Sequence, residues 1–214
     1  MSGKNVLVIL GTAHRMREPG KQSPDGRLKE CVYSREICKE VVVKLQAYGH
    51  KAEVDYEPLD LPRASQTNTV KIERMAELAM RVNYVNELCR QRGAKNVIYV
   101  SIHCNASGSD DKWHNASGWQ VNISNNASQS SKSLAEYLFD AAKANELKVR
   151  QPSATQKYWP QSLYVLNNTK CPAVLTENLF QDNKADVDYL LSEEGRHSII
   201  RLHVEGIINY LEKL

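Results

Sequence analysis

The sequence has no long apolar run. The longest one near its N-terminus covers residues 6–10, which is shorter than the core of a signal peptide and far shorter than the roughly 20 apolar residues that cross a bilayer. The formal net charge is only +3 over 214 residues, too weak to predict binding to nucleic acid. We therefore expect no membrane segment and no nucleic-acid partner.

The sequence also lacks a cysteine framework. Its five cysteines are odd in number and show no CxxC spacing, which argues against a disulfide scaffold and against a thiolate zinc cage. No repeat, low-complexity tract or linker divides the chain. A length of 214 residues suits one α/β domain, and we predict a single domain over residues 1–214.

Apolar periodicity predicts strands that alternate with helices. This alternation is typical of a mostly parallel sheet with helices on both faces, so we expect an α/β fold with a central sheet of about six strands. A loop with Pro58 and Pro62 is expected between the second strand and the second helix. The predicted strands are 5–10, 51–56, 97–103, 118–124, 162–166 and 173–177, and the predicted helices are 30–48, about 71–91, about 130–146 and about 193–213.

Three polar residues are expected at the carboxyl ends of strands, where ligands bind in open α/β sheets. His14 lies just past the first strand, His103 ends the strand 97–103, and Glu177 ends the strand 173–177. A single histidine is more often a hydrogen-bonded core or surface group than a ligand. Three such residues at one edge of the sheet are harder to explain by chance.

Glu30 adds a fourth polar group. It lies seven residues before Ile37, almost two helical turns, and so shares the inward stripe of the first helix. The helix dipole favours an acidic residue in the first turn, but it does not explain one that points inward. A buried carboxylate needs a cation or several donors, and a divalent metal shared with His14 and His103 would satisfy all three residues.

Two imidazoles and one carboxylate are the protein ligands of a typical catalytic zinc site, in which water keeps the fourth position. A second carboxylate is then needed to take a proton from that water and to pass it to a leaving amine, and Glu177 suits this role. The set predicts one zinc ion and metal-assisted hydrolysis of an amide or ester.

Cys104 offers a rival interpretation, because it follows His103 directly and a Cys–His pair can act as a nucleophile. Successive side chains of a strand point to opposite faces. We therefore expect Cys104 to face away from His103 as a buried, inert thiol.

The remaining histidines carry weaker signals. His114, in the loop after the His103 strand, is a candidate for substrate contact, whereas His197 and His203 of the last helix are expected to need no metal. The three tryptophans either line a groove for sugar or peptide or contribute to the core; they are Trp113, Trp119 and Trp159.

Four segments resemble one known family over nearly the whole chain. VILGTAH carries His14, KECVYSREICKEVVVKLQAYGHKAEV carries Glu30, SIHCNA carries His103, and PAVLTENLFQDN carries Glu177. The chain thus resembles the zinc-dependent N-acetylmuramoyl-L-alanine amidases of the amidase type 3 family, which cut the bond between the glycan strand of peptidoglycan and its stem peptide.

The resemblance implies one zinc ion held by His14, Glu30 and His103, with Glu177 as the catalytic residue. The first motif departs from the family pattern, because Arg15 replaces the glycine that usually follows the histidine, and this predicts a narrower or differently charged entrance. Residues expected to bind substrate or to support the site are Asn105, Asn183, Arg15 and His114.

The function implied is hydrolysis of the amide between N-acetylmuramic acid and L-alanine, with peptidoglycan or a muropeptide as the partner. The alternatives are a zinc peptidase or deacylase on another amide, and a catalytically silent peptidoglycan-binding domain. Oligomeric state stays open. With no signal peptide visible, the chain as written is expected in the cytoplasm, acting at the cell wall if a signal was trimmed or if lysis releases it.

Overall fold

Four apolar segments form the parallel part of a six-stranded sheet. They are β1 (Leu7–Thr12), β2 (Lys51–Val54), β3 (Val97–Asn105) and β6 (Ala173–Phe180). The structure is a computed structural model, and it describes residues 5–15, 18–55 and 70–214. Every residue of β1 is buried, as expected for a strand covered by helices on both faces.

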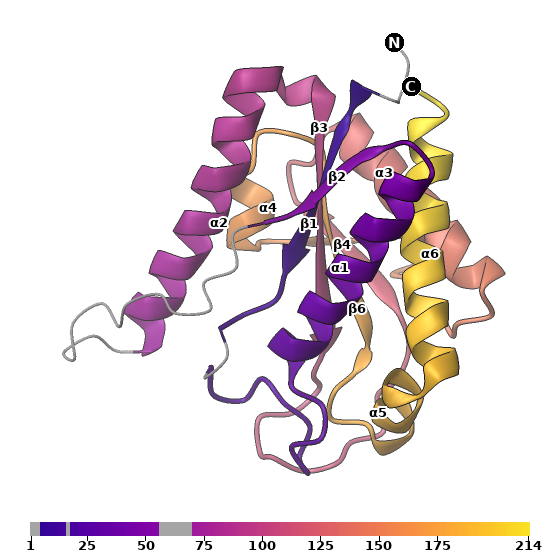
Figure 1. Cartoon of the computed structure of the whole chain (residues 1–214). Coiled ribbons are helices and arrows are strands. Elements are labelled where there is room, and N and C mark those ends of the chain that lie inside the picture. Colours follow the sequence, from indigo (N-terminus) through magenta and orange to yellow (C-terminus); the bar gives the residue numbers. More distant parts are fainter. Residues whose placement is uncertain (1–4, 16–17, 56–69) are drawn as a thin grey trace.

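The strand order is β2-β1-β3-β6-β4-β5. β4 (Gln120–Ser124) runs antiparallel to β6, and β5 (Trp159–Gln161) pairs with β4 in parallel. β6 is the last strand along the chain, yet it lies between β3 and β4 in the middle of the sheet (Figure 1). The sheet therefore becomes continuous only when β6, its final strand, pairs with both β3 and β4.

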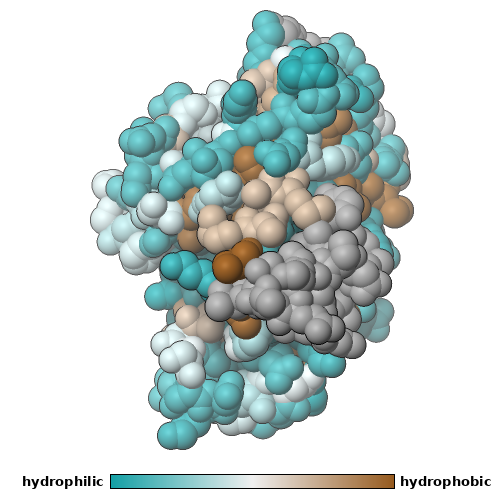
Figure 2. Space-filling view, turned by 90° about the vertical axis from the view of Figure 1, so that its left-hand side faces the viewer, coloured by the Kyte–Doolittle hydropathy of each residue, from teal (hydrophilic) through white to brown (hydrophobic). Residues whose placement is uncertain are grey.

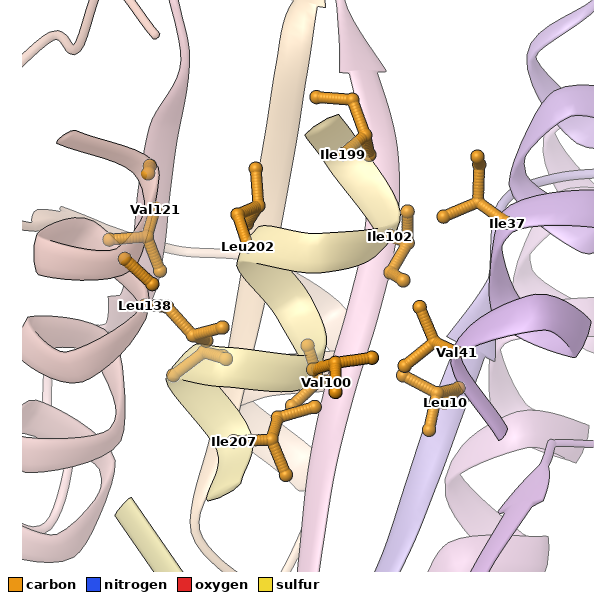
Figure 3. Packing of buried hydrophobic residues seen from close by; sticks show 14 of the residues in the cluster. Leu10, Ile37, Val41, Val100, Ile102, Val121, Leu138, Ile199, Leu202 and Ile207 are labelled. Atoms are coloured by element: carbon orange, nitrogen blue, oxygen red, sulfur yellow. The ribbon is translucent and has the colours of Figure 1, made fainter. Parts of the chain in front are cut away.

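Two layers of helices cover the sheet (Figure 1). One face packs against α1 (Glu30–Ala47), α3 (Gln129–Ala144) and α6 (Glu193–Leu211), and the other against α2 (Val70–Arg92) and α4 (Tyr164–Asn168). Figure 3 shows the first interface, where Val100 and Ile102 of β3 meet Ile37 of α1 and Leu202 of α6. The remaining helices are the 3-10 turn η2 (Ala94–Asn96) and α5 (Lys184–Leu191).

The predicted α/β fold with a mostly parallel six-stranded sheet is confirmed, but one predicted strand is wrong. Residues 162–166 are not a strand: β5 ends at Gln161, and α4 begins at Tyr164. A short apolar run cannot be assigned by periodicity alone. Here Thr169 Oγ1 and Asn168 Nδ2 donate to carbonyls four residues earlier, which favours a helical turn. The expected loop with Pro58 and Pro62 lies outside the described residues.

The surface of the α2 side is largely hydrophilic, with apolar residues gathered near its middle (Figure 2). α2 itself carries three exposed apolar side chains, Val70, Ile72 and Met75. Within the described ranges, no helix has both the length and the apolarity needed to cross a membrane.

Candidate metal and catalytic site

The carboxyl-terminal edge of the sheet brings three of the predicted residues together. His14 follows β1 by two residues and has a positive φ of 49°. His103 of β3 and Glu177 of β6 are direct register partners. Both strands continue beyond the predicted ends, to Asn105 and Phe180, so His103 and Glu177 lie within strands rather than at their last residues.

Glu30 is the first residue of α1 and is only 1% exposed. His103 Nδ1 lies 3.1 Å from Glu30 Oε1, and His14 Nε2 lies 3.3 Å from Glu30 Oε2. The backbone N–H of Cys104 donates to Oε1 at 3.2 Å, and Lys21 Nζ lies 3.9 Å from Oε2. The carboxylate therefore points inward, as the helical spacing predicted.

These three side chains fit a divalent metal ion. One ligand atom each of His14, Glu30 and His103 can be chosen so that all lie within 4.8 Å of one another. The buried Oε2 of Glu30 accepts no well-aligned hydrogen bond among the described residues, although His14 Nε2 lies 3.3 Å from it. This oxygen therefore has a lone pair available for a cation. Two imidazole nitrogens with one carboxylate are a donor set suited to zinc.

The charges of His14, Glu30 and His103 shift one another's pKa values. Burial lowers the pKa of His14, but the charge of Glu30 and the contacts of the His14 ring nitrogens with the carboxylates of Glu18 and Glu30 outweigh this and raise the pKa to about 9. Burial raises the pKa of Glu30, yet the two histidines hold it well below its usual value. Burial lowers the pKa of His103 despite its bond to Glu30. The carboxylate is thus ionised, as a metal ligand must be.

Glu177 differs from Glu30 in its surroundings. Burial, together with the nearby charge of Glu30, raises the pKa of Glu177 to about 8. Its Oε2 is buried and has no hydrogen-bond partner among the described residues. A carboxyl with a pKa near neutrality can both accept and return a proton at that pH. The pKa of Glu30 is lowered and that of Glu177 is raised, which suits Glu30 to binding a cation and Glu177 to transferring a proton.

A cavity of about 290 Å³ joins these groups. His14, Glu30, His103 and Glu177 all line it, and α2 and α4 supply other parts of its wall. Asn105 lines it as well, and its backbone carbonyl accepts a hydrogen bond from the N–H of Gln181. The cavity is large enough to admit part of a substrate beside the polar groups.

Ser34 ties the backbone before each of the two candidate histidine ligands to α1. Its Oγ donates to the carbonyl of Ile102 at 2.6 Å and accepts from the N–H of Ala13 at 2.9 Å. These are the residues immediately before His103 and His14. Since Ser34 follows Glu30 by one helical turn, the same face of α1 supplies both a candidate ligand and its support.

A buried ion pair supports the end of β1 from the other face. Arg81 Nη1 of α2 donates to Asp55 Oδ2 at 2.6 Å. Asp55 also accepts from the N–H and hydroxyl of Thr12 at 3.0 Å and from the Tyr99 hydroxyl at 3.0 Å. Arg81 and Asp55 are each 2% exposed, so this network holds the chain rigidly two residues before His14.

The other predicted support residues lie outside the cavity wall. Arg15 pairs with Glu73 and lies near Glu18. Asn183 caps α5, where its side chain accepts from the N–H of Asp186. His114 binds Asp110 through Nε2. The structure gives these three residues local structural contacts, and a role for them in substrate binding stays a prediction.

The competing interpretation of Cys104 does not fit the structure. Cys104 is buried on the opposite face of β3, within the core against α1 and α6, and burial raises its pKa well above the usual value. Trp119 is also wholly buried, whereas Trp113 is exposed. The expected burial of the Cys104 thiol and that of one tryptophan are thus both confirmed, and the inertness of that thiol stays a prediction.

Sequence reasoning missed several residues around the site. Lys21 lies near Glu30, and Ser101 Oγ lies 3.0 Å from His103 Nε2. Ser101 could have been found, because it precedes His103 by two residues and so shares its face of the strand. The role of Ser34 was signalled by its one-turn spacing from Glu30. Lys21 lies in a loop, for which the sequence has no periodic signal.

Comparison with known proteins agrees with this geometry. The amidase type 3 family, described as N-acetylmuramoyl-L-alanine amidase, matches residues 8–209. The chain belongs to this family. A curated relative, an endolysin of Bacillus phage SPP1, is 31% identical over 122 residues, which cover 57% of this chain and 43% of the endolysin. The matched region thus spans less than half the length of that relative.

Solved structures show the same fold. An N-acetylmuramoyl-L-alanine amidase from Clostridium difficile 630 aligns with a TM-score of 0.75 at 20% identity, over 98% of both chains. The CwlD amidase of Clostridioides difficile, solved in complex with the GerS lipoprotein, aligns with a TM-score of 0.77 at 20% identity, over 98% of this chain and 100% of that one. At this identity the likeness establishes the fold alone.

Proposed function

We propose that this protein is a zinc-dependent N-acetylmuramoyl-L-alanine amidase that hydrolyses the amide between N-acetylmuramic acid and L-alanine in peptidoglycan. The observation that carries the proposal is the convergence of His14, Glu30 and His103 within 4.8 Å beside a cavity that Glu177 also lines. Family membership over residues 8–209 supports the choice of substrate.

His14, Glu30 and His103 would hold the zinc ion. When bound, zinc lowers the pKa of a water molecule and polarises the substrate carbonyl. The protein's own contribution is to fix the three donors. Glu30 is held by α1, while the backbones beside His14 and His103 are joined through Ser34. A donor set that is held in place in this way would lose little conformational freedom when the ion binds.

Glu177 would move the proton. Its raised pKa of about 8 lets one carboxyl oxygen take a proton from the attacking water and then deliver it to the nitrogen of the leaving L-alanine. Protonating that nitrogen lets the stem peptide leave as an amine rather than as an amide anion. General acid–base transfer of this kind contributes about 10²- to 10⁴-fold to a rate.

The proposal is tested by digesting purified peptidoglycan with the wild-type protein and with Glu177→Gln, and by measuring bound zinc in both. Mass spectrometry should detect free stem peptide that begins with L-alanine from the wild type, and at least about 100-fold less from the variant. Zinc should be present in both. Glu136→Gln, at an exposed position of α3, is the matched control and should behave as wild type.

The outcomes separate the competing functions. Zinc binding without release of stem peptide would favour a peptidase or deacylase that acts on another amide. Binding to peptidoglycan without turnover would favour a silent binding domain. Absence of zinc from all three proteins would overturn the assignment of the ligands.

A further inference from the structure

β6 is irregular immediately after Glu177. His103 pairs with Glu177, but the next pair is Asn105 with Phe180. β6 thus uses three residues where β3 uses two, which defines a β-bulge. Leu179 within this bulge has a φ of +62°, a conformation that costs a non-glycine residue of this kind free energy. A strained conformation persists only where its surroundings impose it.

The bulge changes the face of the sheet to which the side chains after Glu177 point. In β6, Leu175 packs with the core toward α2, and Val174 with the core toward α6. Regular alternation would place Leu179 on the face of Leu175 and Glu177, beside the cavity. Instead Leu179 packs in the core with Val174. The bulge therefore removes an apolar side chain from the site and leaves Glu177 facing His103.

Asn178 holds the bulge in place. Its Nδ2 donates to the backbone carbonyl of His103 at 2.8 Å, and its Oδ1 accepts from Trp119 Nε1 at 2.9 Å. Asn178 and Trp119 are both 0% exposed. Trp119 is itself fixed, because its backbone exchanges hydrogen bonds with Lys148 and Arg150. The Asn178 amide thus joins β6 to β3 at the candidate ligand and to a rigid partner beside β4.

We propose that Asn178, locked by Trp119, is a positioning residue that sets the orientation of the Glu177 carboxyl toward the candidate metal site. This inference rests on the proposed function of Glu177. The buried oxygen of Glu177 has no hydrogen-bond partner among the described residues, so the backbone of the bulge must supply the orientation that side-chain bonds do not. Placement errors of about 1 Å at a reacting group can lower a rate by about 100-fold.

The test uses two variants of the full chain. Asn178→Asp keeps the side-chain size but removes the donor to the His103 carbonyl. Trp119→Phe removes the indole N–H and leaves Asn178 itself intact. Each variant should lower kcat on muropeptide by at least about tenfold, while KM stays within about threefold and zinc content stays at the wild-type level. A general loss of structure would lower zinc content together with kcat.

Leu138→Ala is the matched control, because it also disturbs the buried core that contains Trp119 but touches neither hydrogen bond. It should lower the melting temperature and keep the wild-type kcat. Loss of kcat in this control equal to that in Asn178→Asp would attribute the effect to stability, and this would overturn the proposal.

Crystal structures of the wild type and Asn178→Asp add a readout that needs no activity. We expect the variant to lose the positive φ at Leu179 and to turn the Glu177 carboxyl away from His103. An unchanged bulge with wild-type kcat overturns the positioning role. If the wild type itself does not hydrolyse muropeptide, the proposed function fails, and the orientation of Glu177 in these structures still decides the inference. If Asn178→Asp does not fold, the same comparison is made with Trp119→Phe.

Discussion

His103 and Glu177 lie directly opposite each other on the adjacent parallel strands β3 and β6. One strand thus supplies a candidate metal ligand and its neighbour the candidate acid–base group. The relation between the two side chains is fixed by backbone pairing, not by a loop. Sites built on paired strands hold their geometry more closely than sites built on mobile segments.

Replacing Glu30 should abolish tight zinc binding. Glu30→Gln keeps the shape of the side chain but removes the charge that lies beside both His14 and His103. We expect zinc affinity to fall by more than roughly 100-fold. Removing a residue that only hydrogen-bonds to a metal ligand lowers affinity by about 10- to 100-fold, and losing a ligand should cost more. Competition with a chromophoric chelator measures this. Glu36→Gln, exposed on the same helix, serves as the control, and equal affinity in both variants would contradict the ligand assignment.

Removing the Ser34 hydroxyl should weaken both the fold and the site. Ser34→Ala leaves the N–H of Ala13 and the carbonyl of Ile102 without this partner, at a cost of about 1–3 kcal/mol in the free energy of unfolding. Denaturant unfolding measures the loss. Zinc affinity should also fall, because the backbone segments just before His14 and His103 each lose a hydrogen bond that fixes them to α1. Ser133→Ala on α3 should change neither quantity; an unchanged Ser34→Ala variant would show that water replaces the hydroxyl.

Breaking the buried Arg81–Asp55 pair should be more damaging than breaking an exposed pair. Asp55→Ala leaves the guanidinium of Arg81 buried with less compensation, and removing one partner of a buried pair costs about 3–5 kcal/mol. The exposed pair of Glu87 and Arg90 provides the comparison, with Glu87→Ala expected to leave the denaturation midpoint nearly unchanged. Similar midpoints for the two variants would show that Asp55 is not essential to the network.

His203 should make the fold sensitive to acid. Burial lowers its pKa from 6.5 to about 4, so between these values the unfolded chain binds more protons than the folded one. The free energy of unfolding therefore falls as the pH is lowered from about 7 to 4, by up to about 3 kcal/mol at 1.36 kcal/mol per pKa unit. Urea unfolding of the wild type and His203→Gln at several pH values measures this. The variant should show a shallower slope over that range, and equal slopes would refute the assignment.

The sequence predicted the parts of the site that follow from periodicity. The strand ending at His103 and the helix starting at Glu30 placed two polar side chains on defined faces, and the structure brings them together. The helix of residues 30–48 was predicted within one residue of its observed end at Ala47. Regular elements repeat the same preference over many residues, so single uncertain positions matter little.

Features set by single contacts could not be predicted. Alternation alone would have placed Leu179 in the cavity, because nothing in TENLF marks a bulge and leucine disfavours a positive φ. The hydrogen bonds that join Asn178 to Trp119, 59 residues earlier, and to the carbonyl of His103 become visible only in the structure. In the same way, the helical turn of α4 is stabilised by the side chains of Asn168 and Thr169, which follow the apolar run of residues 162–166.

The place of β6 in the sheet has a consequence for how the enzyme is made. While the chain is synthesised up to residue 172, β2-β1-β3 and β4-β5 have no strand to join them, and each group has an unpaired edge that attracts other chains. The strand that joins them also brings Glu177. Chains that end before β6 therefore lack Glu177, the residue to which the proposed function assigns proton transfer, and under that proposal they would not hydrolyse the substrate.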